Sequence, residues 1–167
     1  RGRRGGGLKV EYSQFTDSTT LTTKTGMRGF TLVTIVASGR GLRLLPDSLR
    51  IVFAYEERQP QLSVATPASD FAQLSAAFSV FLLLDGQQRL ALTGGTYTSS
   101  VQNGYGLVPN SLIERLEYPL TREQLTQIAA ASTVEMKART FEAEVAEKVL
   151  EGARDLVRYL ACGATSS

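Results

Sequence analysis

Hydrophobic and polar positions alternate along most of the first 120 residues, with the period of two that is typical of β-strands. The clearest pattern lies at residues 80–92, where two apolar stretches flank Asp85 and Gly86. Asp-Gly between such stretches favours a β-hairpin, because glycine accepts the positive φ that a tight turn needs. The first stretch, residues 80–84, is continuously apolar, which predicts a strand buried on both faces.

Further strands are predicted on both sides of this hairpin. Leu8, Val10 and Tyr12 fall on one face of an alternating segment, which predicts a half-buried strand. The threonine-rich residues 19–25 have high β-propensity but few apolar side chains, which indicates an exposed or edge strand. Met27 and Arg28 lie between two glycines and are predicted to form a turn. The predicted strands are residues 8–15, 19–25, 30–37, 49–55, 80–84, 89–92, 111–118, 133–139 and 141–145.

From Thr121 onward, an apolar period typical of helices appears. Thr121 and Gln124 fit a capping box, and an apolar face follows that predicts a short helix ending near residue 131. A second helix is predicted from about residue 146 to Cys162, where Gly163 is expected to end it. Its apolar stripe consists of Val149, Leu150, Ala153, Leu156, Val157 and Leu160.

Together these patterns predict one α+β domain at residues 8–162. We expect an antiparallel β-sandwich-like sheet of about seven or eight strands, with two helices in the C-terminal third that cover a sheet face or edge. The chain of 167 residues is long enough to bury a core. Residues 1–7 are predicted to be a flexible, basic, glycine-rich leader, and residues 163–167 a disordered tail.

Composition excludes several kinds of chemistry. The chain contains no histidine, which excludes Ser-His-Asp and Cys-His catalysis and every histidine-ligated metal site. Its single cysteine, Cys162, excludes an internal disulfide and any site built from several cysteines. No phosphate-binding loop, dinucleotide fingerprint or calcium loop occurs. We therefore expect no catalytic residues, no metal and no cofactor.

The charge distribution also limits the class of partner. The net charge is +2, but Arg1, Arg3 and Arg4 in the leader supply three positive charges, so the rest of the chain is nearly neutral. Nucleic-acid binding requires several cations on one face, so we expect no nucleic-acid partner. No apolar run approaches the roughly 20 residues that a membrane-spanning helix needs.

The polar, glycine-containing stretch from Gly94 to Gly106 is the candidate ligand-binding region. Its tyrosines and amides are side chains that bind sugars or peptides, and the predicted ligand residues are Tyr97, Gln102, Asn103 and Tyr105. Long polar loops are often functional. The alternative is an exposed meander with an embedded strand.

From about Phe81 onward, the chain resembles an uncharacterised group of bacterial envelope or secreted β-rich domains. The similar motifs are LLLDGQ, SLIERLEYPLTREQLTQIAAA, VEMKARTFEAEV and the final amphipathic helix, and the early VEYSQFTDSTT is similar to the start of such domains. The resemblance implies the fold and a periplasmic, outer-membrane-associated or secreted location, with a targeting signal upstream of Arg1. It implies no site residues.

The predicted function is a non-enzymatic binding or structural module of the bacterial cell envelope. Its expected partner is another envelope protein or a larger assembly of which it is a subunit, and a subunit of this kind exposes an apolar patch when isolated. The alternative is a carboxylate-dependent hydrolase or carbohydrate-binding domain that acts at the Gly94 to Gly106 loop. Glu114 and Glu117 are its candidate acids.

Overall fold

The computed structural model describes residues 8–23, 26–28, 31–40, 48–59, 80–102, 104–106, 110–137 and 142–165. The predicted leader, residues 1–7, lies outside these residues. The described elements are β1 (Leu8–Ser13), β2 (Ser18–Thr23), β3 (Gly26–Arg28), β4 (Thr31–Arg40), β5 (Ser48–Gln59), β6 (Val80–Leu84), β7 (Gln88–Leu92), β8 (Thr96–Gln102), β9 (Asn110–Pro119), α2 (Arg122–Ala130), β10 (Val134–Lys137), β11 (Glu142–Glu144) and α3 (Glu147–Thr165).

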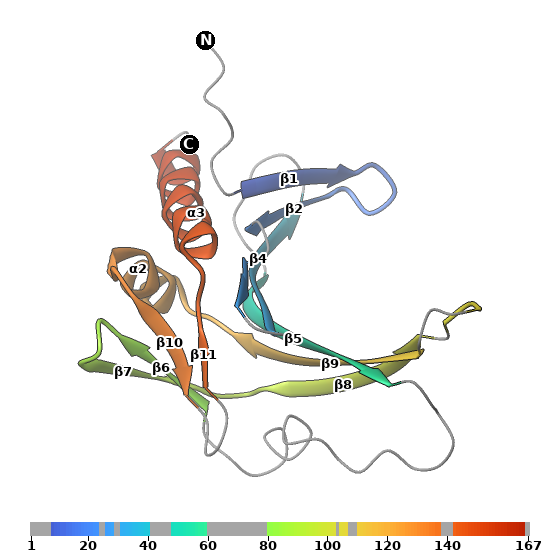
Figure 1. Cartoon of the computed structure of the whole chain (residues 1–167). Coiled ribbons are helices and arrows are strands. Elements are labelled where there is room, and N and C mark those ends of the chain that lie inside the picture. Colours follow the sequence, from blue (N-terminus) through green and yellow to red (C-terminus); the bar gives the residue numbers. More distant parts are fainter. Residues whose placement is uncertain are drawn as a thin grey trace.

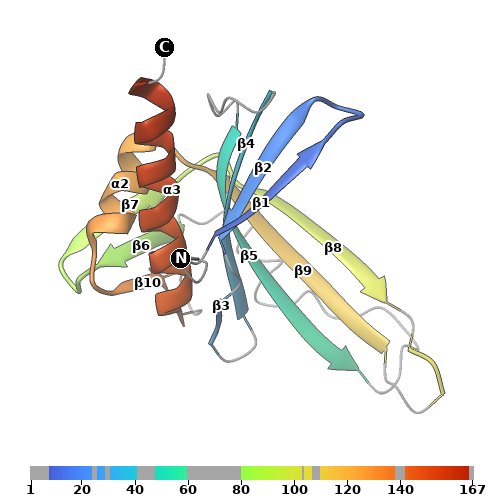
Figure 2. The same ribbon diagram turned by 90° about the horizontal axis from the view of Figure 1, so that it is seen from above.

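The strands form two antiparallel sheets. Seven belong to the large sheet, in the order β1-β2-β4-β5-β9-β8 with β3 paired to β4, and four to the small sheet, β11-β10-β6-β7. The large sheet is strongly curved, and both helices and the small sheet lie on its concave side (Figure 1). The same arrangement is visible from above (Figure 2). The predicted antiparallel α+β fold with two helices in the C-terminal third is confirmed, with more strands than the seven or eight expected.

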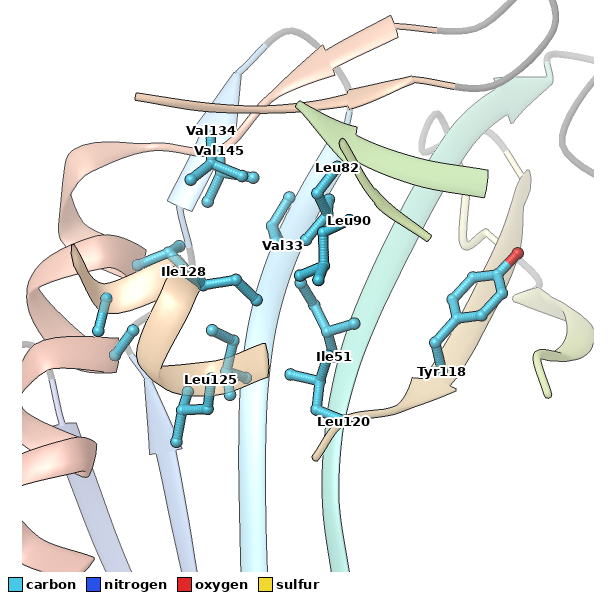
Figure 3. Close-up of a cluster of buried hydrophobic side chains, with 14 of the residues drawn as sticks. Val33, Ile51, Leu82, Leu90, Tyr118, Leu120, Leu125, Ile128, Val134 and Val145 are labelled. Carbon is cyan, nitrogen blue, oxygen red and sulfur yellow. The ribbon is translucent and has the colours of Figure 1, made fainter. Parts of the chain in front are cut away.

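One hydrophobic core joins the two sheets and the helices. Figure 3 shows buried side chains of β4, β5, β6, β7, α2 and β10 meeting in a single cluster. The last helix adds most of its predicted apolar stripe to this core, and it packs against α2 and the first four strands of the chain. The buried hydrophobic residues of α3 are Val149, Leu150, Ala153, Leu156 and Leu160.

The hairpin predicted at Asp85 and Gly86 is confirmed. Their φ angles are 52° and 70°, the positive values that a type I′ turn requires at both central positions. The N–H of Gln87 donates to the carbonyl of Leu84 at 3.0 Å and closes the turn.

The prediction that β6 is buried on both faces is wrong for one face. Val80, Leu82 and Leu84 are buried, but the intervening residues are only partly buried. The ring of Phe81 lies on this second face, where the guanidinium of Arg89 stacks 4.5 Å from its centre. A basic side chain therefore takes the position that a second apolar layer would occupy.

The Asp85 carboxylate fastens the hairpin to the segment between α2 and β10. Its Oδ1 accepts hydrogen bonds from the N–H of Ser132 at 2.8 Å and of Thr133 at 3.0 Å. The N–H of Asp85 donates in return to the carbonyl of Thr133 at 2.9 Å. The turn residue is thus also a long-range tether.

Asp85→Ala is expected to lower the free energy of unfolding by about 2 kcal/mol, because two backbone donors lose a charged acceptor and alanine tolerates positive φ poorly. Asp85→Asn keeps an oxygen at this position and accepts the same φ, so it is expected to cost clearly less. Urea unfolding of both variants measures the difference. Equal losses would contradict the tether.

The threonine-rich strand is not at the edge of the sheet, so this prediction was wrong. β2 lies between β1 and β4, and Thr19, Leu21 and Thr23 are buried there. The hydroxyl of Thr23 accepts a hydrogen bond from the N–H of Ile35 at 2.9 Å, which compensates for its burial. The edge strand is instead β1.

The face of β1 that was predicted to be half-buried is largely uncovered. Leu8 packs partly against the core, but Val10 is 53% exposed and Tyr12 is 44% exposed. β1 is therefore a strand as predicted, while the layer expected to cover its apolar face is not found among the described residues.

Other elements differ from their predicted bounds. The turn expected at Met27 and Arg28 is β3, which pairs with β4. β5 continues to Gln59, because β9 supplies backbone partners along its whole length. α3 continues through Gly163, which costs only about 1 kcal/mol inside a helix, and ends at Thr165 rather than at Cys162.

The predicted capping box at the start of α2 is confirmed. The hydroxyl of Thr121 accepts from the N–H of Gln124, and the Gln124 side chain accepts from the N–H of Thr121. The strands predicted at residues 133–139 and 141–145 correspond to β10 and β11, which pair antiparallel.

Candidate functional site

The stretch from Gly94 to Gly106 contains strand β8, as the alternative interpretation of this region predicts. Tyr97 lies in β8, and Gln102 ends it, about 17 Å farther along at the usual rise of a strand. Tyr105 follows the strand and is 88% exposed, so its ring packs on little. Asn103 lies outside the described residues, as does the side chain of Gln102. The structure does not gather Tyr97 and Tyr105 into one cluster.

Tyr97 contacts instead an acid that was not among the predicted ligand residues. Its hydroxyl donates to Oε2 of Glu114 on the neighbouring strand β9, at 2.9 Å. Glu114 is only 1% exposed. A sequence signal for this burial exists, because Glu114 has the same strand parity as the buried Leu116 and Tyr118.

The electrostatics keep the Tyr97 phenol neutral. Burial raises its pKa above the ordinary 10.0, the hydrogen bond and charge of Glu114 raise it further, and the hydroxyl of Ser99 acts in the opposite direction. A neutral phenol remains a hydrogen-bond donor throughout the physiological range. The pair therefore acts as a fixed donor and acceptor that holds β8 to β9.

The two acids considered as catalytic candidates do not converge. Glu114 and Glu117 differ in parity, so they project from opposite faces of β9. Glu117 lies near Arg50 at 4.0 Å and near Arg115 at 3.9 Å, both at the long limit of an ion pair. Partly exposed pairs of this length add little stability. A carboxylate pair across one substrate is therefore not formed by these two residues.

The face of β9 that carries Glu114 also carries a tight aromatic contact. The ring of Tyr118 lies against the backbone of Gly95, where a Cβ atom would come within 2.4 Å of a ring carbon. Only glycine fits this close approach. Among the described residues, no group of three or more Asp, Glu or Cys side chains is placed to hold a metal ion.

The free energy of unfolding is expected to fall above about pH 10. Tyr118→Phe is expected to make this fall with pH less steep. Burial raises the pKa of the Tyr118 phenol above 10.0. A phenol whose pKa is higher in the folded state stabilises the fold below its unfolded pKa, and this contribution is lost as the pH rises through the folded pKa. Urea unfolding between about pH 8 and about pH 11 measures the effect.

The exposed phenol of Tyr105 provides the matched control for this pH series. Tyr105→Phe removes a phenol at the surface and is unfolded in urea over the same pH range. A slope that is the same in Tyr118→Phe as in the unmodified protein would show that burial of this phenol does not drive the alkaline loss.

Three of the five large exposed hydrophobic side chains among the described residues lie on what we call the edge hairpin, residues 8–23, which comprises β1, β2 and their turn. Phe15 in the turn is 101% exposed, and Val10 and Tyr12 on β1 are about half exposed. The turn is held by its own hydrogen bonds, with Tyr12 donating to Asp17 at 2.7 Å. A structured hairpin thus presents apolar side chains to solvent.

No protein-family model, curated protein or solved structure was found to match this chain. Within the described part of the chain, neither helix combines the length and apolarity that crossing a bilayer requires.

Proposed function

We propose that this chain is a non-enzymatic binding or structural module of the bacterial cell envelope that acts as a subunit of a protein assembly. The observation that carries the proposal is the edge hairpin, which exposes Val10, Tyr12 and Phe15 on the rim of the large sheet. The envelope location rests on the resemblance of its motifs to those of bacterial envelope and secreted domains.

We interpret this surface as an interface because an uncovered apolar edge strand exposes a protein to unwanted association. A soluble protein usually protects an edge strand with charge, proline or a bulge, because an open edge pairs readily with other chains. Here the charges, Lys9 and Glu11, are on one face of β1, and they form an ion pair with each other. The other face is apolar, and aromatic side chains are enriched in the cores of protein interfaces.

A second candidate is a carbohydrate-binding or hydrolytic site at β8, which the hydrogen bond between the partly buried Tyr97 and the buried Glu114 favours. It requires Glu114 as its acid, so Glu114→Gln would abolish binding or turnover of oligosaccharides while Glu117→Gln would not. Loss in neither variant, or in both alike, would count against this site.

The binding proposal is tested by cross-linked capture of the full-length protein from fractionated native cells, with mass spectrometry of what is bound. The test variant carries Tyr12→Ser and Phe15→Ser, and the control carries Tyr105→Ser, which removes an exposed aromatic ring elsewhere. We expect a stoichiometric protein partner in the envelope fraction that the test variant loses and the control keeps. Recovery of the protein alone from the cytosol would contradict the proposal.

A further inference from the structure

We propose that β1 pairs antiparallel with β1 of a second copy of this chain, around a two-fold axis at Val10, so that the two large sheets become continuous. The inference rests on the proposed binding role of the edge hairpin and names its partner. β1 forms the rim of the large sheet, and no described element lies beyond it (Figure 1).

The backbone of β1 presents, at known positions, hydrogen-bonding groups that no described strand pairs with. In antiparallel strands, the N–H and C=O of one residue point to the same side, and successive residues alternate. The N–H of Ile35 donates to the Thr23 side chain, so the backbone N–H and C=O of Ile35 point toward β2. The carbonyl of Leu49 accepts from the N–H of Leu120, so the backbone groups of Leu49 point toward β9. Leu49 pairs with Ala37 on β4, and the backbone groups of Ala37 therefore point away from β5 and toward β2, as those of Ile35 do.

The pairing of β4 with β2 and of β2 with β1 then gives the direction of the backbone groups in β1. Ala37, which has the same phase as Ile35, pairs with Leu21, so the backbone of Leu21 faces β4. The adjacent residues of β2 therefore face β1, where Lys9 pairs with Thr22 and Glu11 with Thr20. The remaining residues of β1 direct their N–H and C=O groups outward; these are Leu8, Val10 and Tyr12.

Charge selects one register for a strand that pairs with its own copy. Outward groups must meet outward groups, so allowed antiparallel registers differ by steps of two residues. With Val10 opposite Val10 of the second copy, each Lys9 faces a Glu11. A register centred on position 9 places two lysines opposite each other, and one centred on position 11 places two glutamates opposite each other. Like charges directly across a strand pair destabilise it.

The apolar face agrees with the same register. Val10 meets its own copy, and Leu8 meets Tyr12 of the second copy on the face that carries no charges. Cross-strand pairs of aromatic and aliphatic side chains stabilise a sheet. Each of these apolar side chains thus gains a cross-strand neighbour from the equivalent residues of the partner, as a self-complementary two-fold interface requires.

The first test is sedimentation of the full chain from low to high micromolar concentration. The unmodified protein is expected to form dimers. Lys9→Glu and Glu11→Lys alone each place like charges opposite each other at both symmetric positions, and each is expected to weaken dimerisation by about tenfold or more. The double variant Lys9→Glu/Glu11→Lys restores opposite charges and is expected to restore the dimer.

A backbone test separates dimerisation from folding. Val10→Pro removes an outward N–H, which an edge strand tolerates, so it is expected to abolish the dimer and leave urea unfolding of the monomer nearly unchanged. Glu11→Pro removes an N–H that faces β2 and is expected to destabilise the fold itself.

Engineered disulfides test the register in a Cys162→Ser background, which has no other thiol. Positions 9 and 11 face each other across the proposed interface as a non-hydrogen-bonded pair, whose close Cα spacing suits a disulfide. A mixture of Lys9→Cys and Glu11→Cys chains is expected to cross-link faster than either chain alone. Faster linkage of one chain to itself would overturn the register.

A monomer at high micromolar concentration, or a double charge swap that fails to restore the dimer, would overturn the homodimer. The proposed binding function fails separately, when cell fractions yield neither another protein nor a cross-linked second copy whose capture depends on the edge hairpin. A monomeric protein that still loses another captured protein in the Tyr12→Ser/Phe15→Ser variant would refute the second copy as partner and retain the binding role.

Discussion

Phe53→Ala is expected to lower the free energy of unfolding by about 4 kcal/mol, the largest effect of a single substitution considered for this fold. Phe53 is completely buried at the centre of β5. Its ring meets that of Tyr118 edge to face, with centroids 6.4 Å apart and an interplanar angle of 70°. Alanine would leave a cavity between the large sheet and the elements packed on it, and would remove this aromatic pair.

Phe53→Leu is the matched control, because it keeps an apolar side chain and loses mainly the ring contact. We expect it to cost about 1 to 2 kcal/mol. Urea unfolding followed by circular dichroism gives both values. A loss below about 1 kcal/mol for Phe53→Ala would mean that β5 is not the centre of the core.

Arg154→Ala is expected to lower the free energy of unfolding by about 3 kcal/mol, because this side chain of α3 caps the end of α2. Its Nε donates to the carbonyl of Ala129 at 3.1 Å, and its Nη2 donates to that of Ala131 at 3.1 Å. Its Nη1 also contacts Glu147 at 2.9 Å. The last carbonyls of a helix lack partners within the helix and carry partial negative charge, which a guanidinium matches.

Arg158→Ala is the control on the same helix. Its side chain is 72% exposed and, within the described part of the chain, hydrogen-bonds only to Asp155, at 3.4 Å, so a change within about 0.5 kcal/mol is expected. Arg154→Lys is expected to fall between the two, because one ammonium group cannot occupy both carbonyls with the geometry of a planar fork. Equal losses in Arg154→Ala and Arg158→Ala would contradict the capping role.

Features that depend only on residues close together in the sequence could be predicted. The Asp85-Gly86 turn requires positive φ at neighbouring positions, and the capping box of Thr121 and Gln124 closes within one turn of helix. Neither depends on which strands pair, so local chemistry determines both. The same applies to the apolar stripe of α3, whose spacing fixes its buried face.

Features that depend on pairing between distant segments could not be predicted. Alternation shows that β2 is a strand, but not that β1 and β4 enclose it or that the hydroxyl of Thr23 finds a backbone donor. Helical spacing leaves Arg154 outside the apolar stripe of α3, but it does not show that α2 packs beside it and supplies carbonyls for its side chain. Pairing of this kind is set by the whole sheet.

The candidate site follows the same division. Tyr97 was predicted as a ligand residue from its polar neighbours, but the partner that the fold gives it, Glu114, comes from a different strand. The alternation of β9 contained the signal for an inward acid, while nothing in consecutive residues linked it to Tyr97. The edge hairpin was visible in the sequence as a strand with an apolar face, and its exposure became evident only from the topology.

The central claim is that the edge hairpin binds protein, and photo-cross-linking in living cells tests it most directly. A benzophenone amino acid replaces Val10 in one strain and Thr98, an exposed residue of the opposite edge strand β8, in another. The account predicts a light-dependent protein adduct at position 10 and little or none at position 98. Only uncross-linked monomer at position 10, or equal adducts at both positions, would contradict it.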